Sequence, residues 1–414
     1  MRSELLRSTV LALWLGELAL DVVLARLNLG AFLPSPPAEL AAEWSEREYR
    51  RSRSYIGDRT RFALISHAVS TAALIAFLFW GGFERIDQST ASFGWGPVGT
   101  GLAYFAALTV LRGVLQFPFS VFETFRLEAK YGFNRTSFHT FLMDRLKGLL
   151  LGSLLGGALL AGVLAFFNGF PASAWFWSWA FFTAFSVGLS FLAPALLLPL
   201  FNKFEPIPEG ALREAIRDYA KSRGFDLQGV FVMDASKRSS KSNAFFIGFG
   251  RYRKLVLFDT LIKTQSVEEI VAVVAHEAGH FQLGHIPRTI ATRLASSLVL
   301  FYFASVGMRS QALFQAFGLS TMSVHGGLVI VSLIYSPLGR FLSVFSNGMS
   351  RRFEYEADSF AVSTYGNRSA LTSALKKLHR ENFAHLTPHR LKVFFDYTHP
   401  PVLDRVRALL KSDS

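Results

Sequence analysis

Apolar residues form long runs along the chain, and shorter polar segments separate them. A helix needs about 20 mostly apolar residues to cross about 30 Å of hydrocarbon, and several runs reach that length. The pattern predicts an integral membrane protein that is mainly α-helical, with seven transmembrane helices. The predicted spans are residues 5–30, 62–82, 97–120, 147–168, 174–201, 289–310 and 325–347.

The first run could be taken for a secretory signal peptide. It extends past a short apolar region, carries Glu17 and Asp21, and lacks a clear small-residue cleavage site. We predict that it is retained as a helix. Residues 34–62, which contain three prolines among many Glu and Arg residues, are predicted to form a solvated connector.

The spans divide the chain into four parts. Residues 1–201 are predicted to form an N-terminal membrane domain with five transmembrane helices, and residues 289–347 to form helices six and seven. Two polar segments, 202–288 and 348–414, follow the fifth and seventh spans. Alternate loops switch sides, so both polar segments are expected on the same face of the membrane.

Composition supports a membrane protein. Hydrophobic residues make up 51% of the chain, and the mean hydropathy is +0.31. The net charge of +13 suits nucleic acid or an anionic membrane surface, and the repeated apolar runs exclude a nucleic-acid binder. There is no cysteine, which excludes a thiol protease, a cysteine zinc site and a disulfide framework.

The distribution of Lys and Arg indicates orientation. These residues are plentiful in some loops and nearly absent from others, and the positive-inside rule assigns the rich ones to the cytoplasm. The rich segments are 31–61, 123–147, 202–288 and 348–414, and the poor ones are 83–96, 169–173 and 311–324. Charges within spans, Arg112, Arg293 and Arg340, are expected to meet partner groups or water, or to snorkel at span ends.

A metal-binding motif lies in the first polar segment. Residues 266–287 read SVEEIVAVVAHEAGHFQLGHIP, which opens with a capping box at Ser266 and Glu269 and predicts one helix that ends at Pro287. His276 and His280 are four residues apart, so both imidazoles can reach one Zn²⁺ from one helix face. Glu277 lies beside them and can take a proton from metal-bound water, the chemistry that peptide hydrolysis requires.

A catalytic zinc site usually has three protein ligands. A histidine six residues after His280 would supply the third, but Ile286 occupies that position and His285 is displaced by one, so His285 is interpreted as a structural or rim residue. The segment 350–358, SRRFEYEAD, offers Glu354 instead. Asp358 shares its helical face and is expected to bond the other ring nitrogen of a ligand histidine.

Residues 243–258 alternate in polarity around a turn at 248–253, which predicts a β-hairpin. A free edge there could hold an extended peptide by adding a strand, and the alternative is a hairpin that only packs on the metal-binding helix.

Together these segments resemble the type 1 CAAX prenyl proteases, a family of integral-membrane zinc metalloproteases. The resemblance is carried by EAKYGFN (128–134), SKSNAFFIGFGRYRKLVLFDTL (240–261), AHEAGHFQLGH (275–285), SRRFEYEADSFA (350–361) and YTHPPVLDRVRAL (397–409). The sequence departs from the family pattern at Glu356, where glutamine is common, and at Ala278, where a bulkier residue is common.

The resemblance implies a role for each matching residue. His276, His280 and Glu354 would bind one Zn²⁺ per chain, and Glu277 would be the catalytic base. His399 would stabilise the oxyanion, and Asn243 and Ala244 would lie on a substrate-binding strand beside the metal. These eight positions, counting Asp358, are the predicted site.

The resemblance also implies a fold and a partner. Seven helices would enclose a water-filled chamber, with the zinc site at its cytosolic end. The substrate would be a peptide or protein, possibly prenylated, in contact with membrane lipid and without nucleic acid.

Two other functions are weighed against a protease. A non-catalytic membrane chaperone or quality-control protein could keep zinc for stability, but structural sites usually have four ligands and no base. A zinc transporter would place its ligands inside the spans, whereas these lie mostly in polar segments.

Overall fold

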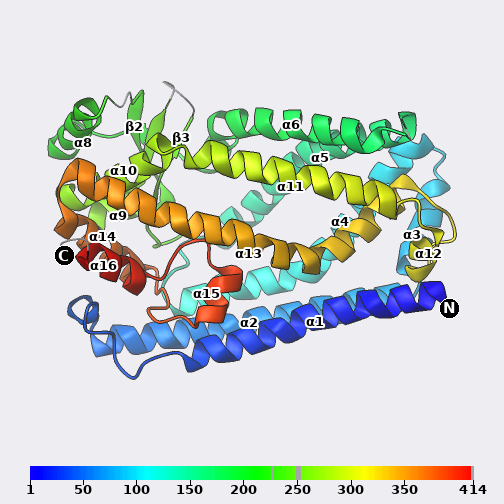
Figure 1. Cartoon of the computed structure of the whole chain (residues 1–414), viewed down its shortest axis with the longest axis horizontal. Coiled ribbons are helices and arrows are strands. Elements are labelled where there is room, and N and C mark those ends of the chain that lie inside the picture. Colours follow the sequence, from blue (N-terminus) through cyan, green and yellow to red (C-terminus); the bar gives the residue numbers. More distant parts are fainter. Residues whose placement is uncertain (171, 225–226, 249–252, 412–414) are drawn as a thin grey trace.

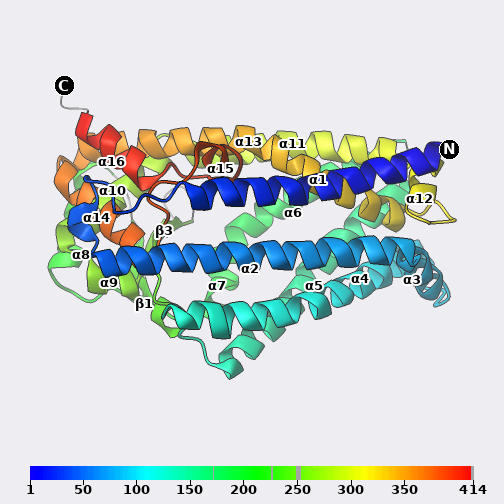
Figure 2. The same cartoon turned by 90° about the horizontal axis from the view of Figure 1, so that it is seen from below.

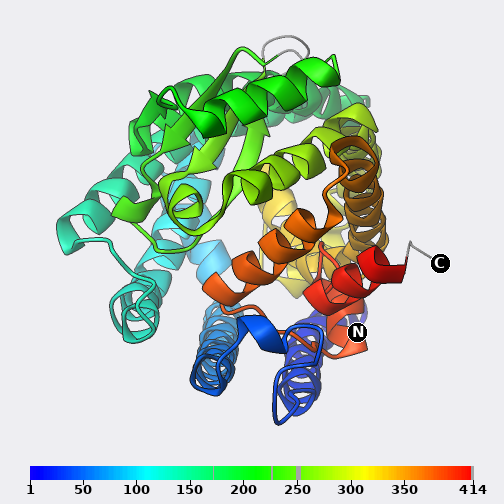
Figure 3. The same ribbon diagram turned by 90° about the vertical axis from the view of Figure 1, so that its left-hand side faces the viewer.

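Long helices run side by side along the longest axis of the molecule (Figure 1). The computed structural model describes residues 1–170, 172–224, 227–248 and 253–411. The long helices are α1 (Arg2–Gly30), α2 (Glu46–Phe79), α4 (Gly96–Phe122), α5 (Phe138–Gly169), α6 (Ala174–Leu196), α11 (His285–Gly307) and α13 (Val324–Tyr365). Viewed end-on, they are arranged around the periphery (Figure 3).

Six of these helices are long and apolar enough to cross a membrane, counting α4 together with the π-helix that continues it. They include every predicted span except the first. That run forms α1, a helix of 29 residues, or about 44 Å, but Glu17, Asp21 and other charges reduce its apolar character. Its N-terminus lies at the end of the molecule opposite α10, α14 and α16 (Figures 1 and 2).

Most of the short elements gather at the two ends of the long helices. Next to or between long helices lie η1 (Ala41–Glu43), α3 (Gly82–Ala91), η2 (Glu123–Glu128), α7 (Leu198–Phe201) and α12 (Gln311–Ala316). The polar end contains β1 (Phe204–Pro206), α8 (Ala211–Ser222), β2 (Gly229–Met233), η3 (Ala235–Lys237), β3 (Ala244–Ile247), β4 (Lys254–Phe258), α9 (Asp259–Thr264), α10 (Val267–Gln282), α14 (Arg368–Glu381) and α16 (Val402–Lys411). α15 (Arg390–Asp396) lies alongside α13 and α1, away from the ends (Figure 1).

A small sheet lies at the polar end, with strand order β1-β2-β4-β3. The predicted hairpin is confirmed as the antiparallel pair β3 and β4, with Ala244 opposite Leu257. Most of its predicted turn, residues 249–252, lies outside the described residues. The prediction missed β1 and β2, which extend the sheet to four strands, with β2 parallel to β4. β3 is therefore an edge strand.

Two helix boundaries differ from the predictions. The connector predicted over 34–62 is wrong in its second half, because a capping box at Ser45 and Glu48 starts α2 at Glu46. The helix predicted to end at Pro287 ends earlier, because Gly284 adopts φ 68°, which favours glycine, and breaks the helix. Pro287 instead lies in the first turn of α11, where its missing N–H costs no hydrogen bond.

One apolar core unites the polar end. Residues from five elements are at most 1% exposed and pack as one cluster. They include Ile216 of α8, Leu257 of β4, Ile270 of α10, Leu371 of α14 and Val406 of α16. α10 contacts α13 on one hand and α8, α14 and β3 on the other. These contacts hold the histidines of α10 in place.

Of the charges expected within spans, Arg340 has found partner groups. It donates to Asp21 Oδ1 of α1 at 2.5 Å and to Asp396 Oδ1 of α15 at 2.8 Å. Arg112 and Arg293 are exposed, and neither forms a hydrogen bond or ion pair with a residue in the described ranges. Of the explanations that were expected, partner groups therefore account for Arg340 but not for Arg112 or Arg293.

Candidate metal centre

The local sequence fixes the helix that carries both histidines. The Ser266 side chain accepts from the Glu269 backbone N–H, and Glu269 accepts from the Ser266 N–H, so the predicted capping box is confirmed. Glu269 is 5% exposed and also accepts from Ser373 and Lys377 of α14. The start of α10 is thereby tied to α14, and its axis is fixed relative to the C-terminal elements.

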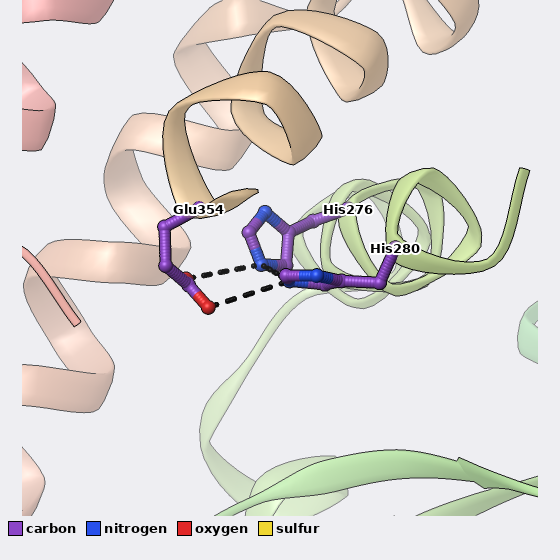
Figure 4. A group of neighbouring side chains, drawn as sticks. All are labelled: His276, His280 and Glu354. Atoms are coloured by element: carbon purple, nitrogen blue, oxygen red, sulfur yellow. Dashed lines mark hydrogen bonds and ion pairs between the residues drawn. The ribbon is translucent and has the colours of Figure 1, made fainter. Parts of the chain in front are cut away.

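Three side chains converge between α10 and α13 (Figure 4). The Nε2 atoms of His276 and His280 are 3.2 Å apart. The Glu354 carboxylate lies 3.5 Å from His276 Nε2 and 3.4 Å from His280 Nε2. Among the described residues, these are the ones grouped closely enough to hold a metal ion.

The separations fit a tetrahedral metal. Ligands at about 2.0–2.2 Å from one zinc ion, at tetrahedral angles, are about 3.3–3.6 Å apart. The three observed separations of 3.2, 3.4 and 3.5 Å agree with that spacing. Two imidazole nitrogens and one carboxylate are also the donors that zinc prefers, so the donor set and its geometry both fit this ion.

Asp358 lies where it was expected. Its Oδ1 is 2.9 Å from His276 Nδ1, so the carboxylate accepts a hydrogen bond that leaves Nε2 free to point at Glu354. Burial alone lowers the pKa of His276, but the hydrogen bonds to Asp358 and Glu354 outweigh it and raise the pKa to about 9. The site therefore stabilises positive charge.

Arg405 of α16 belongs to the same cluster and was missed by the sequence analysis. The guanidinium is 5% exposed and donates to Asp358 Oδ2 and Oδ1 at 2.8 and 2.6 Å. Its Nη1 is 3.2 Å from Glu354 Oε2. The segment that contains it, 397–409, was noted, but no spacing rule connects it with a helix more than a hundred residues earlier.

Glu277 has the surroundings expected of a base. Its half-buried carboxylate forms no hydrogen bond or ion pair with any residue that the structure describes. Burial is the main cause that raises the pKa of Glu277, and the neighbouring histidines oppose it. A carboxylate without a protein partner is free to bond a water molecule.

His399 lies on the open side of the cluster. Its Nε2 is 3.3 Å from Glu354 Oε1, and Thr398 Oγ1 lies 2.9 Å from its Nδ1. His399 also lines a cavity of about 520 Å³ whose other walls come from α1, α2 and the C-terminal segments. This imidazole is the predicted site residue that meets both the cluster and open space.

The remaining predicted residues lie at the start of β3, a strand that contacts α10. β3 packs against α10, and Ala244 is buried there. Asn243 is exposed, and its side-chain oxygen accepts from the Ala244 N–H at 2.9 Å. Six of the eight predicted residues thus lie on α10 or on its direct neighbours α13 and β3, Asn243 directly precedes β3, and His399 reaches the cluster through Glu354.

Comparison with known proteins gives consistent results over the whole chain. The family model described as CAAX prenyl protease N-terminal, five membrane helices, matches residues 29–203, and that of peptidase family M48 matches residues 206–413. A rice protein, CAAX prenyl protease 1 homolog, is 35% identical over 98% of this chain and 96% of its own. The human CAAX prenyl protease 1 homolog is 31% identical over 90% of this chain and 88% of its own. The crystal structure of S. mikatae Ste24p superposes with a TM-score of 0.92 and 26% identity, covering 97% of this chain and 98% of that one.

Proposed function

This chain belongs to the CAAX prenyl protease branch of peptidase family M48, a membrane metallopeptidase family, and from that premise we propose its substrate, ligands and orientation. It hydrolyses a peptide bond near the C-terminus of an isoprenylated or membrane-associated substrate. The observation that carries the proposal is the convergence of His276, His280 and Glu354 beside Glu277, which has no hydrogen-bond or ion-pair partner among the described residues.

The metal is one zinc ion per chain, held by His276, His280 and Glu354. Their spacing and donor types support this choice. When bound, zinc supplies Lewis acidity, which polarises a carbonyl group and lowers the pKa of water to about 7. The absence of a fourth protein ligand among the described residues supports a catalytic rather than a structural site.

Glu277 acts as the general base. Its carboxylate accepts a proton from the attacking water and passes it to the leaving amine. Asp358 holds the proton of His276 on Nδ1, and Arg405 keeps Asp358 ionised and in place. His399 donates a hydrogen bond to the oxygen of the scissile carbonyl as negative charge develops there.

The edge of β3 holds the substrate backbone. An extended peptide can add a strand to this free edge, and its position against α10 would bring the scissile bond to the metal. Asn243 and Ala244 at the start of β3 are the residues assigned to this contact. The cavity beside His399 receives the neighbouring part of the substrate, between the apolar Leu64 and Ile56 and the cationic Arg59.

Seven helices, with α1 as the seventh, enclose a water-filled chamber. Only 6 to 17% of the residues in the apolar windows are buried, which supports helices that face lipid on one side and an open interior on the other. The four parts of the chain are the membrane segments 1–201 and 289–347 and the catalytic segments 202–288 and 348–414, which we assign to the cytoplasmic side. The positive-inside distribution supports this orientation.

The orientation predicts a labelling pattern. The chain has no cysteine, so one introduced thiol reports one position. In sealed inside-out vesicles, Ser369→Cys at the start of α14 is expected to react with a membrane-impermeant maleimide, and Ser92→Cys after α3 is not. Right-side-out vesicles are expected to give the opposite pattern. Labelling of both thiols from one side would contradict the topology.

The substrate class predicts a preference between two peptides. Purified protein is expected to cleave a farnesylated CAAX peptide faster than the same peptide without the lipid, because the lipid concentrates the substrate at the membrane and adds apolar contacts. The ratio of kcat/KM for the two peptides measures this preference. Equal values would remove the prenyl group from the proposal, and cleavage of neither peptide would contradict the substrate class.

A further inference from the structure

A further histidine, His285, lies behind the metal cluster. His285, the first residue of α11, is 2% exposed, so of the two expectations for it, a structural residue or a rim residue, the rim is wrong. Its ring stacks on Phe353 of α13, with 4.1 Å between ring centres and 6° between planes. Stacking fixes the plane of the imidazole, and hydrogen bonds then fix the direction of its two nitrogens.

Both nitrogens of His285 have partners. Its Nδ1 is 3.1 Å from His280 Nδ1, the nitrogen of that ligand that faces away from the metal cluster. Its Nε2 is 3.0 Å from Glu356 Oε2. The left-handed turn at Gly284 brings His285 back against His280, although a continuous helix would keep residues five apart on different faces.

The positions of the protons follow from this chain of contacts. If Nε2 of His280 faces the metal with its lone pair, the proton of His280 lies on Nδ1. That N–H can donate only to an unprotonated Nδ1 of His285, whose proton must then lie on Nε2. The Nε2–H donates to the Glu356 carboxylate, and every polar atom in the series has a partner.

We infer that His285 is a positioning residue for the metal ligand His280, and that Glu356 fixes the tautomer of His285. The inference rests on the zinc ligands proposed above. Asp358 performs the same task for His276 directly. Each proposed ligand histidine is thus oriented by a carboxylate. Asp358 contacts His276 directly, and Glu356 acts on His280 through the imidazole of His285.

The arrangement also explains why Glu354 and Glu356 can both serve the site. Side chains two residues apart on a helix point in very different directions. α13 contacts both α10 and α11, so one flank faces the metal cluster and another faces the start of α11. Glu354 occupies the first flank and Glu356 the second.

The test compares two replacements of His285. His285→Leu puts an apolar side chain in the space of the imidazole and cannot accept a hydrogen bond from His280. His285→Asn fills the space less well but places an amide oxygen near the position of Nδ1. We expect Leu to weaken zinc affinity by about 10- to 100-fold, the usual effect of losing a partner of a ligand histidine, and Asn to retain most of the affinity.

The measurement is zinc affinity by chelator competition, together with the thermal midpoint of the metal-free protein. Glu356→Ala is expected to weaken zinc binding in the same direction as Leu, and it tests the series if the His285 variants do not fold. Arg352→Gln is the matched control, because it removes the exposed Arg352 partner of Glu356 and leaves His285 untouched.

The order of affinities decides the inference. A higher zinc affinity of His285→Asn than of His285→Leu, with the thermal midpoints of both metal-free variants unchanged, supports a hydrogen-bonding role. A zinc affinity of His285→Leu equal to or higher than that of His285→Asn would overturn the inference, because packing alone would then explain the position of His285. Zinc affinity needs no substrate, so this result stands apart from any failure to find peptide cleavage.

Discussion

Replacing Glu277 by Gln is expected to lower kcat for peptide cleavage by about 10²- to 10⁴-fold while zinc stays bound. The amide has the shape of the carboxylate but cannot accept a proton. Glu277 forms no hydrogen bond or ion pair with the described residues, so the substitution breaks no contact of the fold. Its effect should fall on the chemical step, with KM little changed.

The measurement is steady-state cleavage of the farnesylated peptide, with zinc content determined on the same samples. Glu268→Gln is the matched control, because Glu268 is exposed on the same helix and the chemical change is identical. Parental activity in that control and its loss in Glu277→Gln support the assignment. A zinc-loaded Glu277→Gln variant that cuts at the parental rate would show that another group is the base.

Replacing Arg405 by Met is expected to lower the free energy of unfolding by about 3–5 kcal/mol. Arg405 is buried and is the cation that pairs with Asp358 through two hydrogen bonds. Methionine fills similar space but leaves the Asp358 carboxylate buried without that partner. His276 would also lose its orientation, so zinc affinity should fall with stability.

Chemical unfolding in detergent measures the effect. The matched control is Arg407→Met, two residues along α16, whose exposed side chain pairs with Glu39 and contributes little. The double variant Arg405→Met with Asp358→Asn should recover part of the lost stability, because it removes the Asp358 charge that has lost its hydrogen-bonded cation, whereas Glu354 still lacks its Arg405 partner. Equal stability of the Arg405→Met and Arg407→Met variants would contradict this account of Arg405.

Local patterns predicted what local interactions determine. A helix that crosses a membrane needs a long apolar run, and such a run is visible in the sequence. The spans of α4, α5, α6, α11 and α13 therefore followed directly from the sequence. The capping box at Ser266 and the spacing of His276 and His280 are likewise properties of one helix. Each of these features depends on residues within one or two turns.

Features that depend on distant residues could not be predicted in this way. Arg405 meets Asp358 only because α16 folds back onto α13, and His285 meets Glu356 only because α13 contacts α11. β1 and β2 are short strands whose pairing with β4 joins segments separated in the chain. The start of α2 at Glu46 was missed for another reason, since composition outweighed the capping box.

The central claim is that one zinc ion held by His276, His280 and Glu354 is required for peptide cleavage. The most direct measurement removes the metal from the purified protein with a chelator and restores it, while cleavage of the farnesylated peptide is followed. We expect cleavage to fall to background without metal and to return with one equivalent of zinc per chain. Full cleavage by metal-free protein would contradict the claim.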